Sequence, residues 1–169
     1  FVRTDSAEDA QYIRKKAIEN GEEKKLALEG HTVHFDGYYD QARDKDKTRL
    51  LLPSNVDLGS SINSMNRHEG LTEIHIYLKN IMEGKEVYIC FFCLGPTNSQ
   101  FSIPCVQITD SGYVAHSEGI LYRSGYEEFK RMQGSKNFFR FVHSAGVLEK
   151  GVSKNVSRRR VYIDIEDNI

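Results

Sequence analysis

The sequence of 169 residues carries 23 basic and 24 acidic side chains, for a formal net charge of −1. This balance excludes a general attraction to nucleic acid or to an anionic membrane surface, so any anion must be bound locally. The length suits a single domain over residues 1–169 with its own core, and no apolar stretch approaches the roughly 20 residues that a membrane span needs.

The amino-terminal part is expected to be helical. Ser6 begins a Ser-x-x-Asp arrangement typical of an N-cap, and apolar residues then recur at helical spacing, which predicts a helix over about 7–19. Residues 21–30, "GEEKKLALEG", suggest a second short helix, and 31–37, "HTVHFDG", a short strand closed by a turn.

The next segments predict a strand, a loop and a helix. Arg49–Leu52 is a short apolar strand stopped by Pro53, and residues 54–70 have the Ser, Asn and Gly content of an irregular loop. A second helix follows, with Gly84 placed as its left-handed C-cap residue. Its apolar face is formed by Leu71, Ile74, Leu78, Ile81 and Met82.

Strand patterns dominate the second half. Residues 86–95, "EVYICFFCLG", are too continuously apolar for a strand with one solvent-exposed face. They are expected at the centre of a sheet that is covered on both sides. Further strands are expected at 101–110 and 112–123, joined by an Asp-Ser-Gly turn, and at 137–144. A short helix is predicted over 125–132. A last strand is expected to bury Val161, Ile163 and Ile165 on one face.

These elements indicate the fold class. Helical and strand patterns mix without strict alternation, which predicts an α/β protein of α+β character, a mixed β-sheet with helices packed on it. The three prolines and the lack of low-complexity tracts give no sign of an interdomain linker.

The cysteines indicate a reducing compartment. Three cysteines are an odd number in a domain too large to need disulfides, and the amino end "FVRTDSAEDAQ" lacks the pattern of a signal peptide, so a cytoplasmic protein is expected. Cys90 and Cys93 have the spacing of a zinc or redox pair, but on a strand they point to opposite faces. We interpret both as core residues and expect no metal site in this chain.

The remaining chemical motifs are weak. The spacing of His31 and His34 would direct them apart on a strand, and the other histidines stand alone, so no nucleophile and base pair is proposed. No phosphate loop is present, and the basic run Arg158–Arg160 leads into an acidic strand without interleaved aromatic residues. Neither a nucleotide site nor nucleic-acid binding is predicted.

One stretch raises a functional question. In residues 40–53, "DQARDKDKTRLLLP", many charges crowd beside an apolar strand. Arg43 carries a planar guanidinium that can hold a carboxylate or phosphate through two parallel hydrogen bonds. The spacing alone favours a solvated turn whose acidic and basic residues compensate one another. The residues alone leave both readings open.

Three stretches together resemble one enzyme family. "QARDKDKT", "CFFCLGPTNSQFSIPCVQITDSGYVAHSEGILYR" and "HSAGV", in this order, are similar to the amino-terminal region of GTP-type phosphoenolpyruvate carboxykinases, over roughly two thirds of the chain. The most specific residues are Gly95, Pro96 and Ser99, then Thr109, Asp110, Ser111, Tyr113, Val114 and Arg123, then His143, Ser144 and Gly146.

The resemblance implies an activity and a site. Such an enzyme decarboxylates oxaloacetate and phosphorylates the enolate from GTP, giving phosphoenolpyruvate, CO2 and GDP in gluconeogenesis, with Mn²⁺ or Mg²⁺. It also implies a substrate loop in which Arg43 contacts oxaloacetate or phosphoenolpyruvate, with Lys47 and Thr48 completing the motif. Many relatives have a glutamate where this chain has Lys45, so a contact made by that acid is not expected here.

The resemblance also limits what this chain does alone. Family members are several times longer, and their catalytic, metal and nucleotide sites lie beyond residue 169. We therefore expect a substrate-side lobe that partners a carboxyl-terminal lobe of the same enzyme and is inactive in isolation. The alternative is a non-catalytic module that binds an organic anion or a partner protein on the same scaffold.

Overall fold

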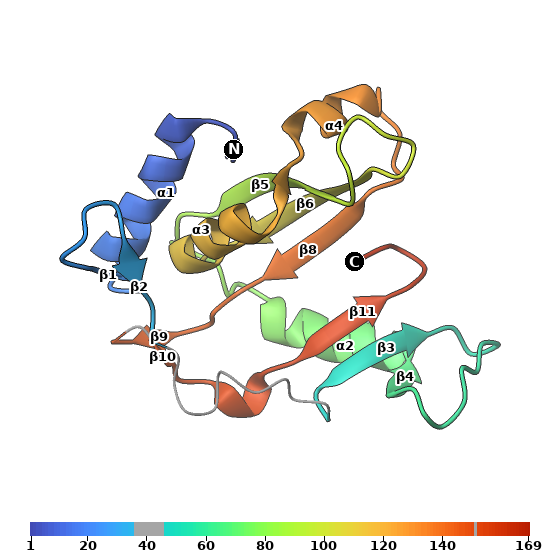
Figure 1. The fold of residues 1–169 in the computed structure, drawn as a ribbon. Coiled ribbons are helices and arrows are strands. Elements are labelled where there is room, and N and C mark those ends of the chain that lie inside the picture. Colours follow the sequence, from blue (N-terminus) through green and yellow to red (C-terminus); the bar gives the residue numbers. More distant parts are fainter. Residues whose placement is uncertain (36–45, 151) are drawn as a thin grey trace.

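The computed structural model describes residues 1–35, 46–150 and 152–169 (Figure 1). The helices in these residues are α1 (Ala7–Glu19), α2 (Arg67–Leu78), α3 (Gly112–Leu121), α4 (Tyr126–Arg131) and the short 3₁₀ helix η1 (Val156–Arg158). The strands are β1 (Lys24–Lys25), β2 (Thr32–Val33), β3 (Thr48–Leu52), β4 (Ser64–Asn66), β5 (Tyr88–Leu94), β6 (Ile103–Thr109), β7 (Arg123–Ser124), β8 (Phe139–His143), β9 (Leu148–Glu149), β10 (Val152–Ser153) and β11 (Val161–Asp164).

The larger sheet in the described residues has the order β7-β5-β6-β8. Strand β5 is antiparallel to β6 and β7, whereas β6 and β8 run parallel. Cys90 and Phe92 face α3 and the core, while Phe91 on the opposite face contacts Tyr126 and Phe129 of α4. The prediction of a central strand covered on both sides is confirmed.

Helix α1 packs against α3 rather than directly on the sheet (Figure 1). The approach is close because Gly112 begins α3, and a Cβ atom there would lie 2.9 Å from the backbone nitrogen of Ala17. Ala17 and Ile13 are almost fully buried in this contact. The small residues at the crossing therefore set how tightly α1 covers the sheet.

A smaller sheet, in the order β11-β3-β4, is parallel throughout. Helix α2 packs on one of its faces, where Gly70 leaves room for Leu51 of β3. Arg67 of α2 donates to the carboxylate of Asp164 at 2.9 and 3.0 Å, and the Tyr162 hydroxyl donates to Glu73. Polar side chains thus join α2 to β11.

Most predicted elements are confirmed. The helix over 7–19 begins as expected, since the Ser6 hydroxyl accepts a hydrogen bond from the Asp9 N–H at 3.2 Å. The strands predicted at 49–52, 101–110, 137–144 and after residue 160 are present, as is the helix within 125–132. The strand predicted within 31–37 is present as β2, while its closing turn at 36–37 lies outside the described residues. Mixed sheets with packed helices give the α+β character that the sequence predicts.

Three predictions in the first half are wrong. Residues 21–30 contain strand β1, which pairs with β2, instead of a helix. The loop expected over 54–70 contains β4 and the start of α2, because Asn66 caps the helix by accepting from the N–H groups of His68 and Glu69. Helix α2 ends at Leu78 with Lys79 as its C-cap residue, so the prediction of Gly84 at this position is wrong.

Two predictions in the second half are also wrong. Residues 112–121 form helix α3 instead of a strand, and Ser111 is its N-cap rather than part of a hairpin turn. The last strand presents the opposite face, since Asp164 is buried while Val161, Ile163 and Ile165 are 50%, 39% and 42% exposed. The partners of Tyr162 and Asp164 on α2 explain this inversion.

Candidate functional site

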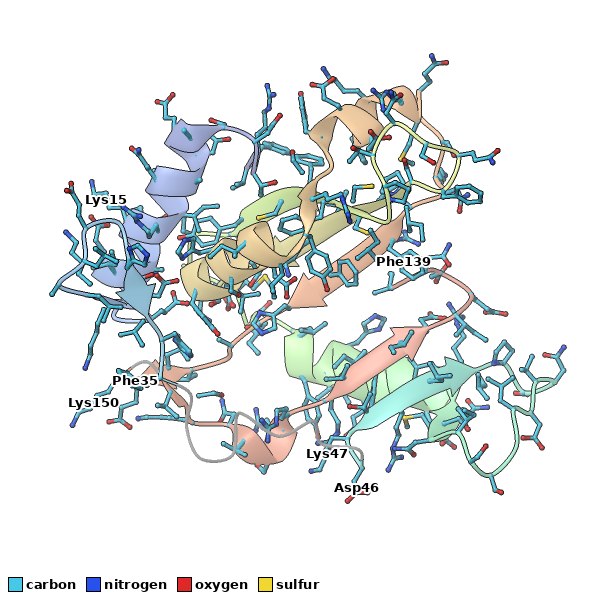
Figure 2. The ribbon with its side chains drawn as sticks, in the orientation of Figure 1. Lys15, Phe35, Asp46, Lys47, Phe139 and Lys150 are labelled. Atoms are coloured by element: carbon cyan, nitrogen blue, oxygen red, sulfur yellow. The ribbon has the colours of Figure 1, made fainter. Side chains whose placement is uncertain are left out.

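Two of the three predicted substrate residues, Lys47 and Thr48, lie at the start of β3. Arg43 falls outside the described residues. Lys47 and Thr48 are described, and Figure 2 shows Lys47 at the amino end of β3. The carbonyl of Lys47 accepts from the Val161 N–H at 3.0 Å, and that of Thr48 accepts from Asn63 Nδ2 at 2.8 Å. The backbone of this end of the predicted loop is therefore fixed to β11 and to the segment before β4.

A second group of polar residues gathers where β6 and β8 end. These strands are parallel and Thr109 lies opposite His143, so the residues that follow both strands are neighbours. We call Thr109, Asp110, Ser111, His143 and Ser144 the carboxyl-end cluster. Two of the three motif regions expected to be most specific thus meet in space, at the edge of a sheet where α/β proteins commonly bind ligands.

Asp110 is the centre of this cluster and its side chain is 1% exposed. Its carboxylate lies 2.5 Å from Lys85 Nζ, and it accepts from the Ser144 hydroxyl at 2.7 Å and the Ala145 N–H at 3.1 Å. Lys85 also donates to the carbonyl of Gly146 at 2.8 Å. A buried carboxylate with these donors fixes the chain that leaves β8.

His143 packs beside Asp110 and contacts Thr109. Its Nδ1 lies 3.0 Å from Thr109 Oγ1, which also accepts from the Ser111 N–H at 3.1 Å. Burial lowers the pKa of His143 below its usual 6.5, against the opposing effect of the Asp110 and Glu22 charges. The imidazole is consequently neutral at pH 7.

The amino end of α3 is capped twice. The Ser111 hydroxyl accepts from the Val114 N–H at 3.1 Å, as in an ordinary N-cap. The Glu22 carboxylate, from the turn after α1, accepts from the Ser111 hydroxyl and from the N–H groups of Gly112 at 3.2 Å and Tyr113 at 3.1 Å. The helix terminus that could bind an anion is therefore occupied by the chain's own carboxylate.

Neighbouring contacts hold residues 22–34 against α3. Glu23 Oε1 lies 2.7 Å from His116 Nδ1, and the rings of His34 and Tyr113 stack with centroids 3.5 Å apart. His34 Nδ1 donates to the Glu22 carbonyl at 2.5 Å. These pairings were not predicted from the sequence, because each partner lies far along the chain and no local pattern connects them.

The third motif region lies elsewhere. Gly95, Pro96 and Ser99 follow β5 at the opposite end of the larger sheet from the carboxyl-end cluster. Of these three, Ser99 borders a shallow hollow of about 470 Å³, whose lining also includes Asn98, Glu128, Arg131 and Asn137. The Glu128 carboxylate accepts from the Asn98 N–H at 2.8 Å and from Arg131 at 2.5 Å. Arg123, in β7, is likewise distant from the cluster.

The cluster is built for rigidity. Its carboxylate, hydroxyls and imidazole already have partners within the chain, which suits a platform more than an acid or base catalyst. Among the described residues, no group of three or more His, Cys, Asp and Glu side chains could hold a metal ion. Cys90 and Cys93 are buried in β5, as predicted for core residues. No helix in the described residues is long and apolar enough to span a membrane.

Comparisons with known proteins assign this chain to a family. The model of the phosphoenolpyruvate carboxykinase N-terminal domain matches residues 1–169. The chain is 62% identical over 167 residues to a phosphoenolpyruvate carboxykinase (GTP) of Thermococcus sibiricus, which covers 98% of this chain and 27% of the relative. It is 62% identical over 168 residues to that of Pyrococcus horikoshii, covering 99% and 27%. Identity to that of Saccharolobus solfataricus is 44% over 168 residues, covering 99% and 26%. The chain spans about a quarter of the length of these curated relatives.

Proposed function

The chain belongs to the phosphoenolpyruvate carboxykinase N-terminal domain family, and we propose that it forms the substrate-side lobe of a GTP-dependent enzyme. The complete enzyme converts oxaloacetate and GTP to phosphoenolpyruvate, CO2 and GDP, a lyase reaction of gluconeogenesis in the cytoplasm. The match to that family over residues 1–169 carries this proposal. High identity to relatives named for the GTP-dependent reaction supports it further.

Arg43 binds the substrate in this proposal. Oxaloacetate and phosphoenolpyruvate both carry carboxylates, and a guanidinium holds a carboxylate or phosphate through two parallel hydrogen bonds. Lys47 and Thr48 add a cation and a hydroxyl, and their backbone is held by the contacts with Val161 and Asn63. The chain thus anchors the end of the loop while Arg43 contacts the anion.

The carboxyl-end cluster supports the site without reacting. Asp110 binds Lys85 and Ser144, and Glu22 caps α3, so the ends of β6 and β8 are held in one arrangement. Rigid surroundings matter because an enolate intermediate is protonated to pyruvate if water reaches it before the phosphoryl group does. The cluster keeps the sheet edge fixed while substrate binds.

GTP and the Mn²⁺ or Mg²⁺ ion are assigned to the carboxyl-terminal lobe of the enzyme. The described residues do not fit a metal, since no group of three or more ligating side chains comes together in them. A phosphate loop is absent from the sequence. Phosphoryl transfer depends on a metal and a nucleotide cradle, so the isolated chain is expected to be inactive.

The test is a coupled assay on the complete encoded polypeptide with oxaloacetate and GTP, then with ATP. GTP should support phosphoenolpyruvate formation, and ATP should not. Arg43→Ala should lower kcat/KM for both oxaloacetate and phosphoenolpyruvate by about tenfold or more, equivalent to about 1.4 kcal/mol. Lys45→Ala is the matched control in the same stretch and should have a milder effect.

Two results would contradict the proposal. If the Arg43→Ala variant kept the wild-type kcat/KM, this arginine would have no role in binding the substrate. A complete polypeptide that binds phosphoenolpyruvate in calorimetry but turns over with neither nucleotide would favour a non-catalytic module that binds organic anions.

A further inference from the structure

Two strands in the described residues are the last members of their sheets. Strand β8 ends the order β7-β5-β6-β8, and β11 begins the order β11-β3-β4. No described strand pairs with the outer edge of either one. In Figure 1 the carboxyl end of the chain lies between β8 and β11, which run in opposite directions. Unpaired strand edges leave backbone groups without partners and are usually covered in native proteins.

The chain already turns back along β11. After Asp164 it makes a turn over residues 165–168 in which Asn168 has a φ of 55°. The Asp164 N–H then donates to the Ile169 carbonyl at 2.6 Å, and the Ile169 N–H donates to the Asp164 carbonyl at 3.3 Å. Two reciprocal hydrogen bonds between opposite residues are the pattern of an antiparallel strand pair. Ile169 is therefore positioned as the first residue of a hairpin partner of β11.

The same turn is bonded to β8. The Asn168 carbonyl accepts from the Arg140 N–H at 2.9 Å, and the Arg140 side chain donates to the Asp167 carbonyl. Arg140 lies within β8, so this N–H points away from β6 toward the outer edge. Asn168 thus bonds to β8 while Ile169 bonds to β11, which is the alternation of a strand with a neighbour on each side.

We propose that the residues following Ile169 in the complete polypeptide continue as a β-strand between β8 and β11. This strand is antiparallel to β11 and parallel to β8, and it joins the two sheets into one. The inference rests on the proposed function only in requiring that this chain is part of a longer polypeptide. The relatives, of which this chain spans about a quarter, provide such a continuation.

The pairing register follows from the bonds already present. Asp164 faces Ile169, so Ile163 faces the first residue after Ile169, Tyr162 the second and Val161 the third. The first of these bonds to β8, where its carbonyl accepts from the Val142 N–H. The second exchanges two hydrogen bonds with Tyr162. The backbone groups of successive residues therefore bond alternately to β8 and to β11.

Exposed apolar side chains of β8 and β11 flank the position of the proposed strand. Val142 of β8 is 43% exposed, and Val161 and Ile163 of β11 are 50% and 39% exposed. Val142 also borders a hollow of about 280 Å³ with residues after α2, among them Ile81 and Met82. A strand between β8 and β11 would bury this apolar surface, and apolar side chains on one of its faces would enter the hollow.

The direction of the strand has a functional consequence. Because it runs parallel to β8, it ends beside the carboxyl-end cluster, near His143. Because it runs antiparallel to β11, it ends beside Val161, whose N–H binds the Lys47 carbonyl. The residues after this strand therefore enter the space between the cluster and the start of β3. The carboxyl-terminal lobe would approach the proposed substrate residues along this route.

Register-specific cross-linking of the complete polypeptide tests the strand. Ile163→Cys is combined with a cysteine at the first residue after Ile169, and Val161→Cys with one at the third, because opposite residues at these positions satisfy disulfide geometry. The two swapped combinations are the matched controls. Under mild oxidation the predicted pairs should form disulfides about tenfold faster than the swapped pairs. Cys90, Cys93 and Cys105 are buried and should not compete.

A second measurement requires no substitution. Amide hydrogen exchange of the complete polypeptide should show slow exchange at Val142 and Tyr162, since both N–H groups bond to the new strand. Fast exchange at these two amides, equal cross-linking of predicted and swapped pairs, or a reading frame that stops at Ile169 would each overturn the inference. The exchange and cross-linking results do not depend on carboxykinase activity, so a failure of the proposed function is recognised separately by the enzyme assay.

Discussion

Lys85 Nζ lies 2.5 Å from Oδ2 of Asp110, and this contact joins the segment before β5 to the end of β6. The two side chains differ in environment, because Asp110 is 1% exposed and Lys85 is 35% exposed. Removing the lysine leaves a buried carboxylate with only neutral donors, whereas removing the aspartate leaves a cation that can reach water. Asp110 also bonds to Ser144 and Ala145, so its loss frees the chain after β8 as well.

Asp110→Ala should therefore lower the free energy of unfolding by about 2 kcal/mol, because Ser144 and Ala145 lose a buried acceptor while Lys85 can still reach water. Asp110→Asn should cost less, because one amide oxygen can still accept from the Ala145 N–H. Urea unfolding at pH 7, with an unchanged m value, measures both losses. Glu149→Gln removes an exposed pair with Lys154 and is the control, expected within about 0.5 kcal/mol of wild type. An Asp110→Ala variant as stable as this control would contradict the role of the pair.

The carboxylate of Glu22 is predicted to be required for the amino end of α3. Glu22→Ala leaves the N–H groups of Gly112 and Tyr113 without their acceptor, which should lower the free energy of unfolding by about 2 kcal/mol. Glu22→Gln retains one acceptor oxygen and should cost about half as much. Chemical denaturation followed by circular dichroism gives these values.

An exposed acid in the same segment provides the comparison. Glu29→Ala removes an exposed carboxylate and should change stability by less than about 0.5 kcal/mol. If Glu22→Ala and Glu29→Ala were equally stable, the capping role of Glu22 would be refuted.

Helix α3 shows why local patterns failed where they did. Tyr113 and Val114 favour strands, and the Asp-Ser-Gly sequence before them is typical of a turn. The helix forms because its first N–H groups bond to Ser111 and to Glu22, which lies 89 residues from Ser111 in the sequence. A contact between residues so far apart cannot be recognised from a short stretch of sequence. Here the tertiary contact outweighs the strand propensity of Tyr113 and Val114.

Strand β11 was predicted correctly but with the wrong face buried. Alternation showed that Val161 and Ile163 share a face, and apolar residues are normally the buried ones. Here Asp164 is buried because Arg67 pairs with it, and Tyr162 lies against α2 because Glu73 accepts from its hydroxyl. Sequence periodicity identifies the two faces, but which face is covered depends on partners from another element.

The candidate site was predictable in part. The motif residues Asp110, Ser111 and Ser144 were identified from the resemblance, and the structure brings them together at the ends of β6 and β8. Glu22 and Lys85 were missed, because buried acids and their partners are defined only by the fold. The role of Arg43 stays a prediction, since that residue lies outside the described part of the chain.

The cysteines are predicted to be unreactive in the native protein. Burial raises the pKa of Cys90 to about 12 and that of Cys105 to about 11, so neither is a thiolate at pH 8. Titration with a chromogenic disulfide at pH 8 should detect no fast thiol in the folded chain and all three after unfolding. Rapid modification of the native protein, or zinc retained stoichiometrically after dialysis, would restore a redox or metal role for Cys90 and Cys93.

His143 predicts how stability changes with pH. Burial lowers its pKa below 6.5, so below that pH the unfolded chain binds a proton that the folded chain resists. The free energy of unfolding should therefore be fully present above about pH 6.5 and fall as the pH decreases, by up to about 1.4 kcal/mol per pH unit. Glu118 acts in the opposite direction, because burial raises its pKa above 4.5 and the folded chain then takes up a proton more readily.

Urea unfolding at pH 7.0 and at pH 5.5, two conditions on either side of about 6.5, separates the two residues. His143→Asn removes the titrating ring and should flatten the loss of stability on acidification. Glu118→Gln removes the opposing contribution and should make that loss steeper. His31→Asn makes the same substitution at an exposed position and controls for the change of side chain itself. If His143→Asn lost as much stability on acidification as the wild type, His143 would not be the buried neutral histidine that its surroundings indicate.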